Sequence, residues 1–257
     1  MKELFEKDQL KFAVSLIIVY TVGMIAAAII SKAAGMPGFF EVMFAAALCR
    51  HITSFARDNK ITEYAGMCIP KKPAKEFLYY IPLYLTAVLP LIFGAEYSGK
   101  ASDLTFLLLK MLMTGILEVL IFTGFLYKAI KQHSDTLAVV ISAVTLGIWN
   151  SAFLFYSKGI FEMLINMICA VAVGSALVFI FRRTGSLIHC LLFLGLNDLL
   201  SVFPTYSLLA KPAGSEHKAL MIVTAVRTVI IIGYIIYICK KTVPLKDGTP
   251  SRKKRTA

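Results

Sequence analysis

Eight apolar runs of about twenty residues each constrain the fold of this chain more than any other feature. A run of that length crosses the hydrocarbon core of a bilayer as an α-helix. The chain is 58% hydrophobic, well above the balance of a soluble domain. We therefore predict an all-α, polytopic transmembrane bundle with eight helices, at 10–33, 36–55, 77–95, 104–130, 137–155, 160–181, 187–209 and 220–239. The second span is the weakest, because Glu41, Arg50 and His51 interrupt it.

The basic residues predict the orientation of the bundle. If both termini lie in the cytosol, twenty of the 27 lysines and arginines fall on the cytosolic side and five fall in outer loops. This asymmetry agrees with the positive-inside rule, so we expect a multi-pass protein of a bacterial cell membrane with both termini cytosolic. The positive charges lie between spans rather than along one stripe with interleaved aromatics, which argues against a nucleic-acid partner.

No soluble domain fits between the spans, because the longest loop, 57–76, has only about twenty residues. We predict one membrane-embedded domain over 1–239, followed by a basic, disordered cytosolic tail at 240–257. The loop segment 61–75 either lies along the cytosolic surface or is a solvated connector. Small residues within the spans should let helix backbones approach closely, namely Gly124, Gly147, Ala170, Ala172, Gly174 and Gly195.

A few polar side chains interrupt the spans far from their ends, namely Glu118, Asn150, Asn197, Asp198 and Arg227. At 1.5 Å per residue, Glu118 lies roughly 14 Å from the cytosolic end of its helix, Asp198 roughly 18 Å and Asn150 roughly 22 Å. Because a lone carboxylate in lipid costs several kcal/mol, we predict that these groups share one site. We expect Arg227 to approach Glu118 or Asp198, as part of a structural ion pair or of a reactive site.

Each of these residues also has a structural interpretation. Asn150 and Asn197 could serve only to hydrogen-bond neighbouring helices. Lys110 and Glu162 lie nearer span ends and should extend their charged groups toward the membrane surface. The histidines show no metal-ligand spacing, and the scattered serines, threonines and cysteines of the spans give no sequence support for a nucleophile–base pair.

Three segments between 115 and 200 carry Glu118, Asn150, Asn197 and Asp198 in a distinctive pattern. The first starts at Glu118-Val119 and reaches Thr123 and a Gly-aliphatic-aromatic run. The second is a serine-containing apolar helix at 142–153, in which Leu146 is followed by Trp149-Asn150. The third opens with Arg-Thr-Gly-Ser-Leu at 183–187 and continues to Leu194, Asn197 and Asp198.

Together these segments resemble the CPBP family of membrane proteins, which includes CAAX prenyl proteases and bacteriocin-processing or self-immunity proteins. The family motifs are E-E-x-x-x-R, F-x-x-x-H and H-x-x-x-N or H-x-x-x-D. Glu118 keeps the first glutamate and Asp198 fits the variant of the last position. Thr123, Asn150 and Leu194 stand where the family has an arginine and two histidines.

The resemblance implies that Glu118 would act as general base, with Asn150 and Asp198 as the other catalytic positions. Asn150 cannot take up a proton as imidazole can, and Leu194 offers neither a donor nor a metal ligand. Losing one oxyanion donor costs about a hundred- to a thousand-fold in rate, and losing a positioned acid or base costs a similar factor. A divalent metal would be expected by family analogy, but its ligands are missing, so we expect no cofactor.

We therefore predict a CPBP-like pseudoprotease that binds, scaffolds or regulates a membrane or envelope protein, or a hydrophobic or lipidated peptide. Its expected partners are the bilayer and such a protein or peptide, and the expected pocket residues are Thr123, Trp149, Leu194, Asn197 and Arg227. Two alternatives stay open. One is an active intramembrane endopeptidase that uses Glu118 in CAAX-type processing or bacteriocin self-immunity. The other is a small proton-coupled carrier or permease subunit.

Overall fold

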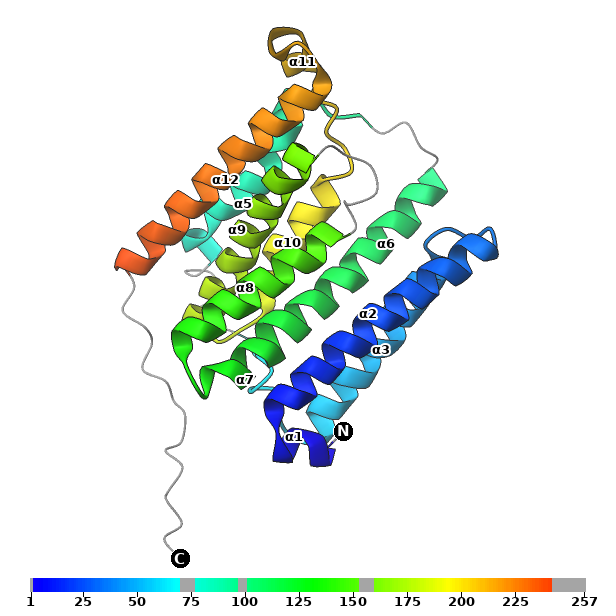
Figure 1. Cartoon of the computed structure of the whole chain (residues 1–257), viewed down its shortest axis with the longest axis vertical. Coiled ribbons are helices and arrows are strands. Elements are labelled where there is room, and N and C mark those ends of the chain that lie inside the picture. Colours follow the sequence, from blue (N-terminus) through cyan, green and yellow to red (C-terminus); the bar gives the residue numbers. More distant parts are fainter. Residues whose placement is uncertain (1, 70–76, 97–100, 153–159, 242–257) are drawn as a thin grey trace, which may run out of the picture.

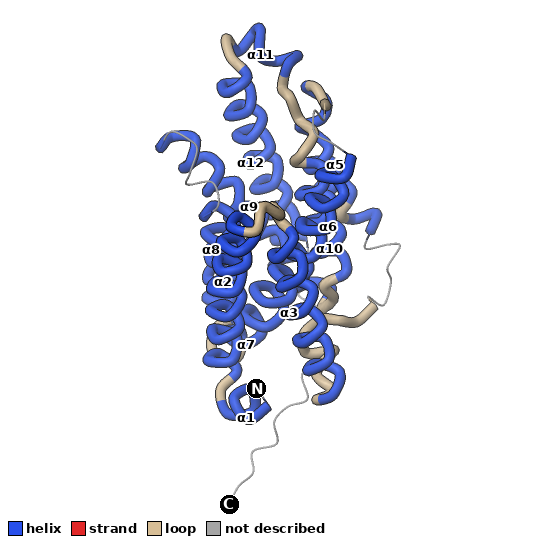
Figure 2. Tube along the Cα trace, turned by 90° about the vertical axis from the view of Figure 1, so that its right-hand side faces the viewer, coloured by secondary structure: helices blue, strands red, loops and turns tan. Residues whose placement is uncertain are grey.

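The computed structural model describes residues 2–69, 77–96, 101–152 and 160–241, and helices make up most of that part (Figure 1). Five helices are long and apolar enough to cross a membrane, namely Gln9–Ala33, Phe39–Asp58, Leu104–Lys131, Met163–Thr184 and Glu216–Ile238. Three shorter apolar helices occupy Ile81–Phe93, Asp135–Trp149 and Ile188–Leu200. Each predicted span therefore has a helical counterpart, and the all-α polytopic bundle is confirmed (Figure 2).

The helices follow one another with short connections. Their bounds are α1 Lys2–Lys7, α2 Gln9–Ala33, α3 Phe39–Asp58, α5 Ile81–Val88, the 3₁₀-helix η1 Leu89–Phe93, α6 Ala101–Glu118, the π-helix η2 Val119–Leu126, α7 Tyr127–Lys131, α8 Asp135–Ala152, α9 Ile160–Thr184, α10 Ile188–Leu200, α11 Ser207–Ala213 and α12 Glu216–Lys241. In Figure 1, α2 and α3 form a pair on one side of α6, and α12 lies on the opposite side of the bundle beside α9.

The predicted seventh span, 187–209, ends early because α10 stops at Leu200. Pro204 has no N–H to continue the helical ladder. The chain instead pairs with the end of the third span: Glu96 donates its N–H to the Phe203 carbonyl at 2.9 Å, and Thr205 donates to the Gly94 carbonyl at 3.1 Å. A short helix, α11, then follows before α12.

The π-helix η2 lies at the centre of the bundle. Its sequence, Val-Leu-Ile-Phe-Thr-Gly-Phe-Leu, is apolar on nearly every side, and all eight residues are buried. A helix of this kind needs neighbours all round, and η2 contacts α2, α8, α9 and α10. The residue directly before η2 is Glu118, so the core of the fold fixes the position of that carboxylate.

The described part of the loop after α3 packs against the turn between α9 and α10, so residues 61–69 are not a solvated connector. Whether the loop lies along the cytosolic surface stays a prediction. Ala65 is fully buried. Leu187 donates its N–H to the Gly66 carbonyl at 2.9 Å, and the Ser186 hydroxyl donates to the Cys68 carbonyl. Residues 70–75 of this loop and the tail 242–257 lie outside the described residues.

The Arg-Thr-Gly-Ser-Leu lead of the third motif forms the turn between α9 and α10. Gly185 takes a positive φ of 67°, which ends α9 and which side chains with a Cβ rarely adopt. Thr184 Oγ1 accepts the Ser186 N–H at 3.2 Å, and Ser186 Oγ accepts the Ile188 N–H at 3.3 Å. The turn thus fixes where α10 begins and how it is aimed.

Close approach at glycines is confirmed for three predicted positions. A Cβ on Gly147 would lie 2.7 Å from Val171 Cα, and one on Gly174 would lie 2.7 Å from the Ala143 carbonyl oxygen. These contacts set the spacing of α8 and α9. A Cβ on Gly124 would lie 3.0 Å from the Ala65 carbonyl oxygen, whereas Gly195 has nothing within 4 Å, so the prediction for Gly195 is wrong.

Candidate functional site

Glu118 is the last residue of α6 and the N-cap of the π-helix η2. Its side chain is only 6% exposed. π-helical turns inside longer helices are rare and occur frequently at functional sites, because they change which side chains share a face. The change from α to π geometry therefore coincides with the buried carboxylate.

Two neutral donors from two other helices converge on one oxygen of Glu118. Trp149 Nε1 of α8 donates to Glu118 Oε1 at 3.1 Å, and the Tyr20 hydroxyl of α2 donates to the same atom at 3.3 Å. The two rings pack together, with centroids 4.8 Å apart. Three helices thus meet at this carboxylate. Its position is fixed by two residues that lie far from it in the sequence, Tyr20 and Trp149.

Sequence reasoning placed Trp149 in the pocket but missed Tyr20. Tyr20 is fully buried in the middle of α2. A tyrosine within an apolar span, rather than at the membrane surface where tyrosines gather, is a signal that its hydroxyl needs an internal partner. That signal does not say which helix supplies the partner.

The first and second motifs contain two further positions of interest, Thr123 and Asn150. Asn150 follows Trp149 within α8, and its side chain lies outside the described residues. Thr123 lies in η2 and is fully buried. Its hydroxyl has no hydrogen-bond partner among the described residues.

Asp198, Asn197 and Arg227 form a chain of hydrogen bonds between α10 and α12. The Asn197 amide donates to Asp198 Oδ1 at 2.9 Å, and Arg227 Nη2 donates to Asn197 Oδ1. The amide therefore presents its N–H₂ to the acid and its oxygen to the guanidinium. In this arrangement Asn197 links two charged groups across two helices.

The expected direct approach of Arg227 to an acid takes a different form. Within the described residues, no ion pair joins Arg227 to Glu118 or Asp198, and Asn197 stands between Arg227 and Asp198. Arg227 also makes no hydrogen bond to Thr123, the position where the family motif has an arginine. Asn197 is thus a relay, which a single-helix reading of the sequence cannot distinguish from a packing residue.

We predict that Asn197→Leu lowers the free energy of unfolding by about 1–3 kcal/mol, because it leaves a carboxyl and a guanidinium without their shared partner. Asn197→Leu in an Asp198→Asn, Arg227→Met background should cost much less, since both charges are already gone. Unfolding in mixed micelles measures both values. Equal costs in the two backgrounds would contradict the relay.

The hydrogen-bonded chain of Asp198, Asn197 and Arg227 lies close to the Glu118 cluster, which is Glu118 with Tyr20 and Trp149. The two meet on neighbouring turns of α6. A Cβ on Gly115, one turn before Glu118, would lie 3.5 Å from Asp198 Oδ2 and 3.8 Å from a methyl of Leu194. Gly115 therefore lets α10 approach α6 closely. Leu194, at the family's histidine position, is buried at this contact.

The residues at this site do not fit a divalent metal. The oxygen of Glu118 that Tyr20 and Trp149 contact faces two N–H or O–H donors, and Leu194 has no ligand atom. Over the described parts of the chain, no group of three or more His, Cys, Asp or Glu side chains could hold a metal ion. We derive no reaction step through a metal.

A second buried polar group, His189, was not singled out by the sequence. His189 lies in the first turn of α10 and is 2% exposed. Its Nδ1 lies 3.1 Å from the Tyr84 hydroxyl, and its ring packs near Tyr80, with centroids 5.5 Å apart. These contacts thus come from Tyr80 and Tyr84, at the N-terminal end of α5.

Lys110 does not simply extend toward the membrane surface, as the sequence predicted. Its ammonium lies 2.9 Å from Glu41 of α3, and the Glu41 side chain is only 8% exposed. The acid that weakened the second span is thus paired with a lysine of α6. Glu162, the other residue of that prediction, has a side chain outside the described residues.

The chain was compared with known protein families, curated proteins and solved structures. A family model described as type II CAAX prenyl endopeptidase Rce1-like matches residues 100–200. This segment contains all three motif regions, so the match confirms the resemblance that those motifs suggested. No curated protein and no solved structure matches the chain.

Proposed function

We propose that this multi-pass membrane protein, whose residues 100–200 match the Rce1-like family model, binds a hydrophobic or lipidated peptide of a membrane or envelope protein without cutting it. Such binding would regulate the peptide's parent protein or neutralise a peptide toxin. Under this proposal the protein retains the family's recognition of membrane peptides and has lost the hydrolysis of the peptide bond.

The hydrogen bonding of Glu118 carries the proposal. A carboxylate oxygen has two lone pairs, and Oε1 already accepts from Trp149 and Tyr20. A general base must instead offer a lone pair to the water that it activates. Both donors are held by ring packing between helices, so releasing this oxygen would break two buried hydrogen bonds. The other oxygen, Oε2, is not engaged by these donors but is buried, so a water would first have to reach it.

The neighbouring motif positions support the same proposal. Leu194 is buried where the family has a histidine, and it cannot stabilise an oxyanion. Asn150 cannot exchange a proton near neutral pH. Each loss costs about a hundred- to a thousand-fold in rate, so the remaining residues support recognition better than turnover.

An active endopeptidase is the second candidate, and the π-helix beside Glu118 favours it. Local π geometry is frequent at functional sites, and Glu118 retains the residue type of the family's base. Under this hypothesis Tyr20 and Trp149 would move away when substrate binds. Dependence of cleavage on Glu118 separates the two candidates.

A photocrosslinking experiment tests the proposed binding. Hydrophobic and prenylated peptides that carry a photoreactive group and a tag are added to the protein in nanodiscs, with and without the same peptide lacking the group. We expect the wild type and Glu118→Gln to capture the same peptides, intact and to within about twofold, because glutamine keeps the acceptor oxygen. Competable capture of no peptide by the folded wild type would contradict the proposal.

Two glycine variants control this experiment. Gly115→Leu inserts a side chain between α6 and the Asp198–Leu194 face of α10, and it should reduce capture. Gly233→Leu adds the same side chain in α12, where nothing lies within 4 Å of the new Cβ, and it should leave capture unchanged. Equal effects of the two variants would place the bound peptide away from the motif helices.

A further inference from the structure

A cavity of about 760 Å³ opens at the end of the α2–α3 pair that lies away from α1. It is separate from the Glu118 cluster, since Lys110 precedes Glu118 by two turns of α6, or about 12 Å. Its volume falls within the range of small-molecule sites, about 300–1,000 Å³. The lining combines apolar side chains with one ammonium, namely Met36, Pro37, Gly38, Phe39, Phe106, Leu107 and Lys110.

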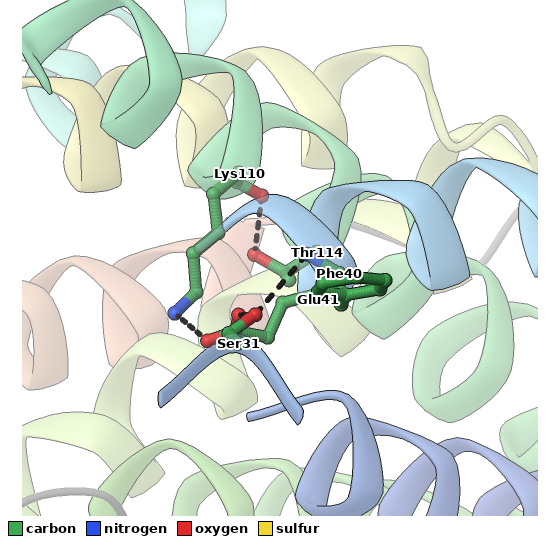
Figure 3. Close-up of polar contacts among 5 residues, drawn as sticks. All are labelled: Ser31, Phe40, Glu41, Lys110 and Thr114. Atoms are coloured by element: carbon green, nitrogen blue, oxygen red, sulfur yellow. Dashed lines mark hydrogen bonds and ion pairs between the residues drawn. The ribbon is translucent and has the colours of Figure 1, made fainter. Parts of the chain in front are cut away.

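A network of hydrogen bonds fixes the ammonium at the cavity wall (Figure 3). Lys110 Nζ donates to Glu41 Oε1 at 2.9 Å, and the Ser31 hydroxyl donates to Glu41 Oε2. The Phe40 N–H donates to Ser31 Oγ at 3.1 Å. Both oxygens of Glu41 are thus engaged, and Glu41 orients Lys110 as a positioning residue.

The charges around this wall favour an anion. Glu41 offsets one positive charge, but Lys110 is joined at this end by Lys32, which is exposed in the last turn of α2. The N-terminus of α3, which begins at Phe39, adds about half a positive charge, which the C-terminus of α2 at Ala33 offsets. Among the described side chains the balance is therefore positive. An ammonium has three donors, and Glu41 uses one of those of Lys110.

The rest of the cavity favours a hydrocarbon chain. Met36 is 54% exposed, Phe39 37% and Phe106 46%. The Phe39 ring of α3 and the Phe106 ring of α6 pack edge to face, with centroids 6.4 Å apart. One wall with a fixed cation and the others apolar match a molecule that has an anionic head and an apolar tail.

We propose that this cavity binds an anionic phospholipid of the leaflet opposite the N-terminus, with the phosphate at Lys110 and the upper acyl chain against Phe39, Phe106 and Leu107. The bilayer supplies such a lipid at high local concentration, and lysines at membrane surfaces attract anionic headgroups. This site goes beyond the proposed peptide binding and uses none of the motif residues.

Native mass spectrometry of the protein in micelles with equimolar phosphatidylglycerol and phosphatidylcholine tests the site. The wild type should retain one phosphatidylglycerol with about a tenfold preference, because both lipids offer a phosphate to Lys110 but phosphatidylcholine also brings a choline cation close to the lysines at this end. Lys110→Gln should reduce the preference to within about twofold of unity. Glu41→Gln should increase it, because Lys110 loses its internal partner.

Opposite effects of the two charge variants separate a lipid site from a structural ion pair. If Lys110→Gln does not fold because Glu41 is left unpaired, the double variant Glu41→Gln, Lys110→Gln removes both charges and should also lose the preference. Leu107→Trp should reduce retention of both lipids by filling the cavity. Leu112→Trp, on a 50% exposed position of the same helix, is the matched control and should retain them.

Three results would overturn the site. They are equal retention of the two lipids by the wild type, an unchanged preference in folded Lys110→Gln or the double variant, and a reduced preference in Glu41→Gln. None of these results bears on peptide capture at the motif helices, so failure of the lipid site and failure of the proposed function are distinguishable.

Discussion

Gly147→Ala is expected to lower the free energy of unfolding by about 3 kcal/mol, at the upper end of the range for overpacked cores. The new Cβ would lie 2.7 Å from Val171 Cα and 2.8 Å from Val171 N. These are backbone atoms, so no side-chain rotation relieves the clash. The helices α8 and α9 would have to separate, which would loosen the face that carries Trp149.

Unfolding in mixed micelles measures the effect. Gly195→Ala is the matched control, because Gly195 also lies inside a helix and has nothing within 4 Å of the new Cβ. It should be neutral, or stabilising by up to about 1 kcal/mol through helix propensity. A Gly147→Ala protein as stable as Gly195→Ala would show that α8 and α9 do not pack as closely as described.

Glu118→Leu is expected to lower the free energy of unfolding by about 2–5 kcal/mol. It leaves the Trp149 indole N–H and the Tyr20 hydroxyl buried without their acceptor, and each such group costs about 1–3 kcal/mol. Trp149 is the only tryptophan of the chain, so its fluorescence reports directly on this contact. Its emission should shift to shorter wavelength as the indole loses its polar partner.

Conservative variants separate the hydrogen bonds from the charge. Glu118→Gln keeps an acceptor oxygen and should retain most of the stability and the emission wavelength of the wild type. Tyr20→Phe removes one donor and should cost about 1 kcal/mol. Tyr20→Phe in the Glu118→Leu background should cost nothing or stabilise, because the hydroxyl has already lost its partner. Additive costs would contradict the shared contact.

Much of the fold could be predicted because bilayer thickness ties span length to hydropathy. The helix ends could not be predicted as well. The seventh span stops at Leu200 because Phe203 and Thr205 pair with the chain near Gly94. That pairing joins segments about a hundred residues apart, so no local sequence pattern predicts it. The inward loop around Ala65 was missed for the same reason.

The candidate site could likewise be predicted only in part. The cost of a charge in lipid indicated Glu118 and Asp198 from the sequence alone. Which donors satisfy them depends on how the helices turn about their axes and pack, so Tyr20 could not be assigned. The ion pair of Glu41 and Lys110 was missed because each residue, taken alone, looked like an interruption or a span end.

The match of residues 100–200 leaves the role of Glu118 as the central question. In the proposed pseudoprotease this carboxylate is a hydrogen-bond acceptor that holds α2 and α8 against η2. In an active endopeptidase one of its oxygens, both of which are buried, would have to face water. The two roles predict different results for one assay.

That assay incubates the purified protein in nanodiscs with a library of tagged hydrophobic and prenylated peptides and counts new peptide termini by mass spectrometry. Wild type and Glu118→Gln are compared on samples shown to be folded by their Trp149 emission. We predict no peptide that the wild type cleaves and Glu118→Gln leaves intact. A peptide cleaved at one defined bond by the wild type, and not by Glu118→Gln, would contradict the proposed function.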